Sequence, residues 1–361
     1  MAKPSRSQTI WIVVGSLLQA SLLAGLWFAF VYQGFGDDVL VIGGGGGAPP
    51  EAYSVYTGEG ITRQQFEQRP LAVMIAGDPI TRPQSGLGIA DVVVEMEAAQ
   101  GITRFMALFQ SVIPEQIGSI RSARNDYIDL ARGFDAVFVH WGGEKLALDR
   151  LASDNTEEID QFQNGDLFYR DPAIPAPHNG FTTEDGMQEG LERYDYERTP
   201  KFSDWEFTDA SDLADRPTAG LLELIYGSQE FNIEYAYDPD TNTYARSQGG
   251  LAHEDAVSGS QIATTNIIVM RAGHRTYSQA GGYLEVAIQN GGECSLYRDG
   301  REIPCKWDKG SQDDPLIFET LQGSPLSLTP GKTWVQVMLP GADVDWSASY
   351  AVDFTGQSKV R

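Results

Sequence analysis

The sequence has few basic residues, and it also has few cysteines and histidines, the side chains on which disulfide-rich and many metal-binding proteins depend. Its 361 residues include two cysteines and four histidines, and 26 Lys and Arg stand against 50 Asp and Glu. Two cysteines exclude a disulfide-built miniprotein. A net charge of −24 repels nucleic acid, which excludes DNA and RNA binding. The hydrophobic share of 42% excludes a wholly disordered chain, and the length suits two domains.

Several catalytic and cofactor motifs are also missing. The histidines, at 140, 178, 253 and 274, have neither H-x-x-x-H nor H-x-x-E-H spacing, which a helical zinc site would show. No G-x-S-x-G elbow and no phosphate-binding P-loop occurs. We therefore expect neither a metal nor another cofactor, although a site assembled from distant residues leaves no such signature.

One segment near the start is long and apolar enough to cross a membrane. No charged residue lies between Arg6 and Asp37, and aromatic residues stand near both ends of the stretch from Ile10 to Tyr32. Lys3 and Arg6 precede it, so the positive-inside rule predicts a cytoplasmic tail at 1–9, a transmembrane helix at 10–32 and an extracytoplasmic remainder. The alternative is a cleaved signal peptide, but its small-residue cleavage site is missing.

A tether and two unequal halves are expected after this span. Five consecutive glycines and two prolines make residues 33–66 a flexible linker. Strand and helix patterns alternate over 67–228, which predicts an α/β or α+β domain that closes with a helix around 211–226. Short strands separated by turn residues over 229–361 predict a smaller all-β domain, either a sandwich or an open barrel.

The expected helices and strands of the first half follow from apolar runs and periodicity. They comprise strands at 70–76, 90–97, 102–110 and 135–141, and helices at 123–132 and 144–153.

The two cysteines flank a hairpin signal. Asp299-Gly300 favours a two-residue turn, in which cross-strand partners have numbers that add to 599, as Cys294 and Cys305 do. Facing residues lie about 5.5 Å apart at Cα, within disulfide range. We expect a structural disulfide, in agreement with an oxidising exterior. Two free buried thiols are the alternative.

Arginines are unusual in the apolar part of this acidic chain, and four of them are candidate ligand-binding residues. Arg104 interrupts a strand pattern, and Arg121 and Arg124 stand where a helix is expected to begin. With Arg82, they suit a carboxylate or phosphate, because guanidinium groups and helix N-termini both bind anions. The alternative is that they neutralise nearby carboxylates in structural networks, namely those of Asp91, Glu95, Glu97 and Asp129.

Glu95, His140 and His178 are the candidate catalytic residues. Glu95 and Glu97 share one face of a strand, a spacing that suits the paired carboxylates that glycoside hydrolysis needs, although a solvated strand face has the same spacing. His140 ends a buried strand, where α/β folds open ligand crevices. His178 lies in a proline-stiffened loop, next to Asn179, which is a further candidate ligand-binding residue. For each histidine, a structural role is the alternative.

The motifs that hold these residues carry a resemblance. The chain is similar over residues 67–350 to the YerB-like lipoprotein family, whose function is unknown, and the resemblance implies an extracytoplasmic, membrane-tethered protein. It departs from that family at the start, where no lipobox cysteine is present and a transmembrane helix is expected instead. The segments that carry the resemblance are RPLAVMI (69–75), RPQSGL (82–87), ADVVVE (90–95), GITRFMALFQS (101–111), IGSIRSAR (117–124), VHWGG (139–143), APHN (176–179) and GKTWVQVMLPGADVDW (331–346).

Three functions are compatible with these patterns. The first is a cell-envelope protein that binds a wall glycan or another acidic ligand in an Arg- and His-lined crevice. The second is a wall-acting hydrolase or lyase with Glu95 as general acid and His140 or His178 as base. The third is a structural partner of a membrane complex. We favour the first, because no catalytic signature is present.

Overall fold

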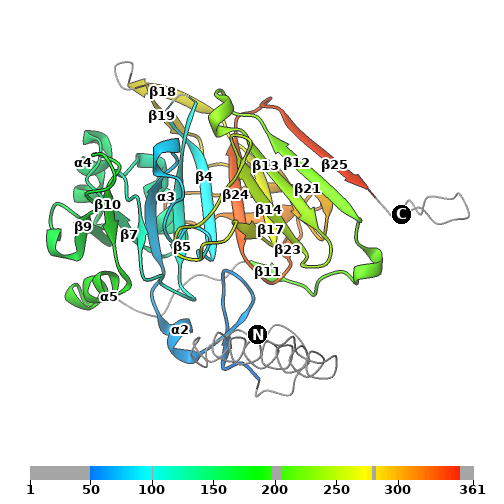
Figure 1. Cartoon of the computed structure of the whole chain (residues 1–361), viewed down its shortest axis with the longest axis horizontal. Coiled ribbons are helices and arrows are strands. Elements are labelled where there is room, and N and C mark those ends of the chain that lie inside the picture. The colour runs from blue at the N-terminus through cyan, green and yellow to red at the C-terminus, as the bar shows by residue number, and fades with distance from the viewer. Residues whose placement is uncertain (1–48, 100, 197–204, 279–281, 350–361) are drawn as a thin grey trace, which may run out of the picture. The chain divides into compact units, whose positions relative to one another are not determined.

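The computed structural model describes residues 49–99, 101–196, 205–278 and 282–349. Its largest sheet has twelve strands, ten of them in the order β22-β21-β20-β17-β24-β4-β5-β3-β7-β8, with β18 and β19 attached beside β4 (Figure 1). These strands are β3 (Leu71–Ala76), β4 (Val92–Ala99), β5 (Ile102–Phe109), β7 (Val137–His140), β8 (Glu158–Asp160), β17 (Asn266–Arg271), β18 (His274–Ser278), β19 (Tyr283–Val286), β20 (Gly292–Arg298), β21 (Arg301–Asp308), β22 (Ile317–Thr320) and β24 (Thr333–Met338). β24 pairs in parallel with both β4 and β17, so strands from early and late in the sequence share one sheet.

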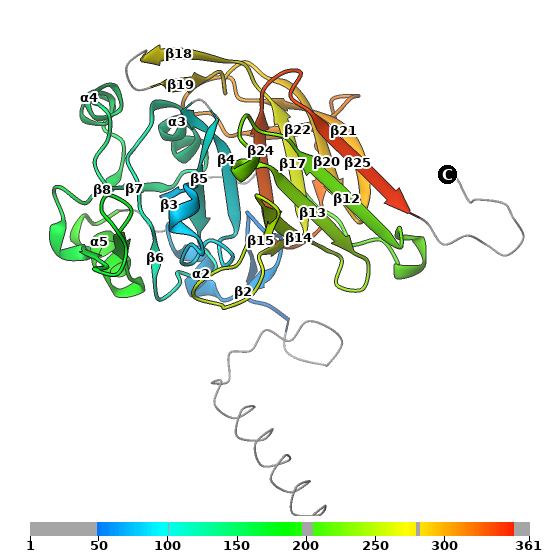
Figure 2. The same ribbon diagram turned by 45° about the horizontal axis from the view of Figure 1, so that its top comes forward.

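A second sheet of six strands packs against one face of the central sheet (Figures 1 and 2). Its order is β15-β14-β13-β12-β25, and β16 pairs with β14. In β13 buried and exposed residues alternate strictly, as expected for a strand with one face on a core. The strands are β12 (Ala219–Leu224), β13 (Ile233–Asp238), β14 (Thr243–Gln248), β15 (Leu251–Ala252), β16 (Ala263–Thr264) and β25 (Val344–Ser349).

The central sheet separates two apolar cores, because its strands are apolar on both faces. In β3, Ala72 and Met74 join the core that contains residues of α3 and α4, while Val73 and Ile75 join the core shared with the second sheet and α5. The helices are α2 (Arg63–Glu67), α3 (Asn125–Gly133), α4 (Lys145–Asp154) and α5 (Glu184–Arg193). The mixed α/β architecture expected from the alternating patterns is confirmed, and beyond α5 the described residues form strands and 3₁₀ turns but no α-helix.

The helix expected around 211–226 is wrong. That stretch contains a 3₁₀ turn and then β12, which pairs with both β13 and β25. Leu222 and Leu224 are buried with a period of two, while Glu223 between them is only half-buried. Neighbouring strands satisfy the backbone here, and this tertiary context overrides the helical preference of a leucine-rich run.

The later part of the stretch expected as a linker, 33–66, contains folded elements. Residues 50–66 contribute β1 (Ala52–Tyr53), β2 (Gly60–Ile61) and the start of α2 to the folded part of the chain. Tyr56 is fully buried and its hydroxyl donates to the Phe134 carbonyl at 2.6 Å. Two further small sheets are built from β6 (Ile117–Gly118), β10 (Gly180–Thr182) and β9 (Phe168–Arg170), and from β11 (Glu206–Phe207) and β23 (Ser327–Leu328).

The expected cytoplasmic tail and transmembrane helix at 10–32 lie outside the described residues. Within the described ranges, none of the helices has the length and apolar character that a membrane crossing requires.

The predicted cysteine hairpin is confirmed. β20 and β21 pair with Cys294 opposite Cys305 and Ser295 opposite Pro304, the register that the two-residue turn requires. Asp299 and Gly300 both have positive φ, 52° and 69°, as a type I′ turn demands. The disulfide joins the cysteines with their Cα atoms 4.8 Å apart, and both side chains are buried.

Candidate functional site

Glu95 of β4 lies in a buried polar cluster between the two sheets. Its carboxylate is fully buried and accepts hydrogen bonds from the Thr103 hydroxyl at 2.7 Å, Arg246 Nη2 at 2.8 Å and Gln336 Nε2 at 3.0 Å. Arg246 comes from β14 in the second sheet and Gln336 from β24 in the central sheet. The cluster therefore ties the sheets together and leaves Glu95 no open oxygen.

Arg246 is equally enclosed. Its guanidinium is fully buried, lies over the Trp334 ring at 4.6 Å, and also donates to the Tyr235 hydroxyl and to the Gln248 side chain. His253 contacts the same guanidinium through Nδ1, and its Nε2 meets the Gln84 side chain at 2.6 Å. We call the group of Glu95, Arg246, His253 and Gln336 the closed cluster, since its charged and polar groups satisfy one another.

His140 is also enclosed, and both of its ring nitrogens have hydrogen-bond partners. Its ring is fully buried at the end of β7, with Nδ1 at 2.8 Å from the Gly142 carbonyl and Nε2 at 2.7 Å from Glu158 of β8. In the described residues no hydrogen bond or ion pair joins Glu95 to His140 or His178. A general acid and its base must reach a common substrate within hydrogen-bond distance, and this geometry does not favour the Glu95-based acid–base site.

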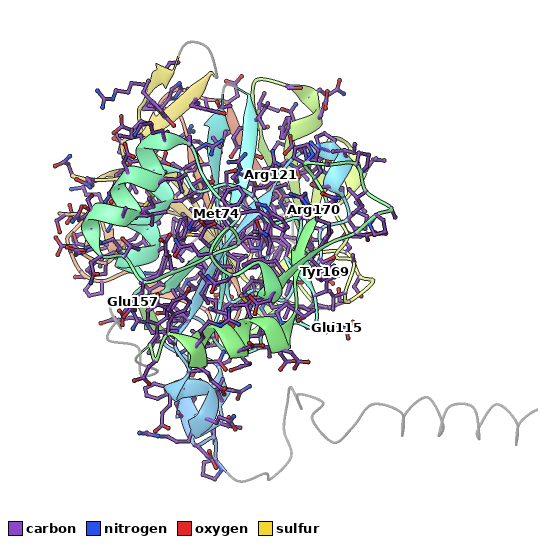
Figure 3. The ribbon with its side chains drawn as sticks, turned by 90° about the vertical axis from the view of Figure 1, so that its left-hand side faces the viewer. Met74, Glu115, Arg121, Glu157, Tyr169 and Arg170 are labelled. Carbon is purple, nitrogen blue, oxygen red and sulfur yellow. A yellow bond between two sulfur atoms is a disulfide. The ribbon has the colours of Figure 1, made fainter. Side chains whose placement is uncertain are left out.

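Arg104, Arg121 and Arg124 meet beside the start of α3. Arg104 projects from β5, and the other two belong to the segment between β6 and α3, which lies against the end of β3 through an Arg121 N–H donated to the Met74 carbonyl at 2.9 Å. We call these three residues the open cluster. Figure 3 shows Arg121 and Met74 in the view onto the side of the molecule that carries α4 and α5.

No carboxylate among the described residues forms an ion pair with the open cluster. Four arginines in the described part of the chain are buried: Arg69, Arg104, Arg124 and Arg246. Arg69 pairs with Asp135 and Glu157, and Arg246 pairs with Glu95. Arg104 and Arg124, each only 6% exposed, form no ion pair with any described residue, and neither Nε donates a hydrogen bond.

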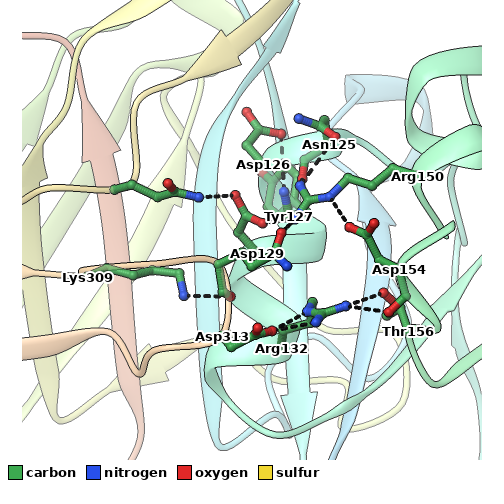
Figure 4. Close-up of polar contacts among 12 residues, drawn as sticks. Asn125, Asp126, Tyr127, Asp129, Arg132, Arg150, Asp154, Thr156, Lys309 and Asp313 are labelled. Carbon is green, nitrogen blue, oxygen red and sulfur yellow. Dashed lines mark hydrogen bonds and ion pairs between the residues drawn. The ribbon is translucent and has the colours of Figure 1, made fainter.

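The carboxylates that were the alternative partners are bound elsewhere. Asp129 pairs with Arg150, as Figure 4 shows for the polar contacts around α3. Asp91 accepts from the backbone N–H groups of Gln110 and Ser111. Glu97 accepts from the Gly101 N–H at 3.1 Å. The open cluster is therefore not an ordinary salt-bridge network like the one in Figure 4.

Burial and mutual repulsion lower the pKa values of arginines in the open cluster. Burial, reinforced by the positive charges of Arg124 and Arg121, lowers the pKa of Arg104 to about 9. Burial also lowers the pKa of Arg121, an effect that Asp78 opposes and Arg124 strengthens. Buried positive charges without counter-ions are costly, so an anion would stabilise this arrangement.

His178 borders the open cluster. Its loop is held where the Arg121 guanidinium donates to the Pro177 carbonyl at 3.1 Å. Burial and the charge of Arg121 lower the pKa of His178, although Asp78 opposes this, with its carboxylate 3.8 Å from Nδ1. His178 is therefore favoured as a neutral imidazole at the edge of the site.

The side chains of the remaining predicted residues have partners other than these arginines. The Asn179 side chain accepts from Arg170 at 2.6 Å and donates to the Asp171 carbonyl, so it holds its own loop. Arg82 donates to the carbonyls of Gly77 and Glu230, and burial together with the charge of Arg246 lowers its pKa.

Two residues of the site were missed by the sequence analysis. Asp78 follows β3 and acts electrostatically on Arg104, Arg121 and His178. Tyr283 of β19 lies under the Arg124 guanidinium, 4.5 Å from the ring centroid. Nothing in their local sequence marks them, because more than 150 residues separate Tyr283 from Arg124. Among the residues that the structure describes, no group of three His, Cys, Asp or Glu could hold a metal.

Comparisons with known proteins agree with this architecture. Residues 56–197 match the N-terminal domain, and residues 222–335 the C-terminal domain, described as "Protein of unknown function (DUF3048)". The chain is 33% identical over 287 residues to "Putative lipoprotein YerB" of Bacillus subtilis (strain 168), covering 78% of this chain and 85% of that protein. It is also similar to the crystal structure of the YerB protein from Bacillus subtilis, with a TM-score of 0.73 and 31% identity over 82% of this chain and 99% of the other. The chain therefore belongs to the YerB-like family with paired DUF3048 domains.

Proposed function

We propose that this chain is a membrane-tethered extracytoplasmic protein that binds an anionic component of the cell envelope. Arg104, Arg121 and Arg124 hold the anion, and His178 lies beside them. The single observation that carries the proposal is the pair of buried guanidinium groups, Arg104 and Arg124, with no carboxylate partner among the described residues. A buried charge is tolerated when it is paired, so the missing partner points to a ligand.

The proposed location rests on several features. The relative from Bacillus subtilis carries the word lipoprotein in its name, and lipoproteins are held at a membrane. The charge-free stretch from Ile10 to Tyr32 supplies an anchor in place of a lipid, with the N-terminus in the cytoplasm. The disulfide between Cys294 and Cys305 suits an oxidising compartment outside the membrane.

Calorimetric titration tests the binding function. The full chain, purified in detergent, is titrated with soluble muropeptides, which carry carboxylates, and with glycerol phosphate, which carries a phosphate. We expect saturable binding to at least one of them and about a 10- to 100-fold weaker affinity in Arg104→Met and Arg124→Met, since each loses a charge-assisted hydrogen bond.

The matched control is Arg63→Gln, which removes the same charge from an exposed position on α2. Equal affinity in wild type, Arg104→Met and Arg124→Met would place the binding elsewhere, and no binding of either ligand would remove the proposal.

A further inference from the structure

We infer that the group bound by the open cluster is a phosphate monoester rather than a carboxylate. This inference rests on the proposed function and names the class of its ligand. Three features of the site carry it: the number of free donors, the balance of charge and the helix that starts at the cluster.

The three guanidinium groups outnumber the two oxygens of a carboxylate. A guanidinium has five N–H donors. The guanidinium of each of the three arginines donates one hydrogen bond to a described residue, in every case to a backbone carbonyl, namely that of Ser122, Pro177 or Ala123. A carboxylate has two oxygens, so it can give an oxygen of its own to at most two arginines, whereas a phosphate monoester presents three terminal oxygens. Only the phosphate offers one oxygen to each arginine.

The open cluster carries an excess of positive charge. Two carboxylates act on the cluster: Asp78, which affects Arg104 and Arg121, and Asp126, whose interaction is with Arg124. Asp126 is engaged by the backbone N–H groups of Val286 and Tyr127. Three guanidinium groups thus exceed the two carboxylates, before the helix contributes.

The N-terminus of α3 adds to this excess. Arg124 is the N-cap residue of this nine-residue helix, and its side chain does not cap it. A helix N-terminus contributes roughly half a positive charge. A phosphate monoester carries about −1.5 to −2 at neutral pH and matches the resulting excess better than a carboxylate does.

Tyr283 fixes one wall of the site. The Arg124 guanidinium lies over its ring at 4.5 Å, which orients the plane of the donors. Because a phosphate ligand depends on that planar fork, Arg124→Lys keeps the charge yet should still weaken binding about tenfold.

The test is calorimetric titration of the full chain in detergent with four probes. Inorganic phosphate and glycerol 3-phosphate carry the dianion, dimethyl phosphate is a monoanionic diester, and acetate is a carboxylate. We expect the two dianions to bind at least about tenfold more tightly than the other two, and Arg104→Met to lose this preference. Arg63→Gln, which binds as wild type, is the control, and thermal unfolding shows whether each variant is folded.

The outcomes separate the two proposals. Acetate or dimethyl phosphate binding as tightly as glycerol 3-phosphate would overturn the monoester inference and leave anion binding in place. Absence of binding by all four probes, with muropeptides also silent, would overturn both. A short-chain phosphatidic acid distinguishes the source: tighter binding than glycerol 3-phosphate supports a lipid headgroup, and equal binding supports a water-soluble or polymer-borne monoester.

Discussion

The closed and open clusters place buried arginines in opposite circumstances. In the closed cluster, Arg246 faces Glu95 and its donors are distributed over Tyr235, Gln248 and Glu95. In the open cluster, Arg104 and Arg124 are almost as buried but donate only to backbone carbonyls. Burial of a charge therefore does not by itself mark a binding site. What distinguishes the open cluster is that no described carboxylate pairs with its buried charges.

The positions of the clusters explain this difference. Glu95 and Arg246 come from different sheets, so their ion pair lies in the dry interior where the sheets meet. Arg121 is only half-buried and Arg124 precedes a helix, so the open cluster reaches the surface at one side. The buried position of the closed cluster suits a structural ion pair, whereas a ligand can reach the open cluster only because that cluster extends to the surface.

The largest expected effect comes from opening the closed cluster. Glu95→Ala leaves Arg246 buried and unpaired, and removing one partner of a buried pair costs about 3–5 kcal/mol of unfolding free energy. Chemical denaturation of wild type and variant measures it. A loss below about 1 kcal/mol would mean that the cluster is not sealed from water.

The buried carboxylate near the open cluster gives the next largest effect. Burial raises the pKa of Asp126 to about 6, above its ordinary 3.8, so its ionised form disfavours folding. This contribution is unfavourable at neutral pH and disappears as pH falls through 6 toward 4. Relative to wild type, Asp126→Asn should therefore gain up to roughly 3 kcal/mol of unfolding free energy between pH 4 and pH 7.

Asp154→Asn is the control, and the pH dependence of its unfolding free energy should have the opposite sign. A hydrogen bond from Arg150 lowers the pKa of Asp154, so its contribution to stability is present at neutral pH and lost on acidification. Relative to wild type, the unfolding free energy of Asp154→Asn should therefore decrease as pH rises. Parallel pH profiles for the two variants would contradict the different environments assigned to them.

A smaller effect on stability is expected within the open cluster. Arg104→Met removes a buried charge that has no partner and keeps an apolar stem, so unfolding free energy should change by no more than about 1 kcal/mol, with a gain as readily as a loss. Arg246→Met is the matched comparison, and its unfolding free energy should fall by as much as that of Glu95→Ala. Denaturation curves for the two methionine variants compare the clusters directly, and a similar large loss in both would mean that Arg104 has a structural role.

The smallest effect is expected at Arg121. This residue is half-buried and donates to the Pro177 carbonyl, so Arg121→Ala should change stability by only about 0.5 kcal/mol. It should nevertheless weaken anion binding, which calorimetric titration measures. Unchanged binding would restrict the site to Arg104 and Arg124.

Part of the candidate site was predictable because it is local in sequence. Arg121 and Arg124 are three residues apart and precede a helix whose periodicity is clear, so their proximity follows from the chain itself. Glu95 and His140 were harder to interpret. The partner of Glu95 lies 151 residues away, and that of His140 lies 18 residues away on another strand. Whether an acidic or imidazole group is paired depends on which strands become neighbours.

Several features follow from short-range geometry and could be predicted from the sequence. These are the helices α3 and α4, the strands β3 to β5, and the register that brings Cys294 to Cys305 across a two-residue turn. Long-range contacts, in contrast, make 219–224 a strand and insert β24 between β4 and β17. They also pair Arg246 with Glu95, while Arg104 forms no ion pair with a carboxylate of the described chain. The reason is physical: turns and periodicity act over a few residues, whereas sheet order and charge pairing are set by contacts between segments far apart in the chain.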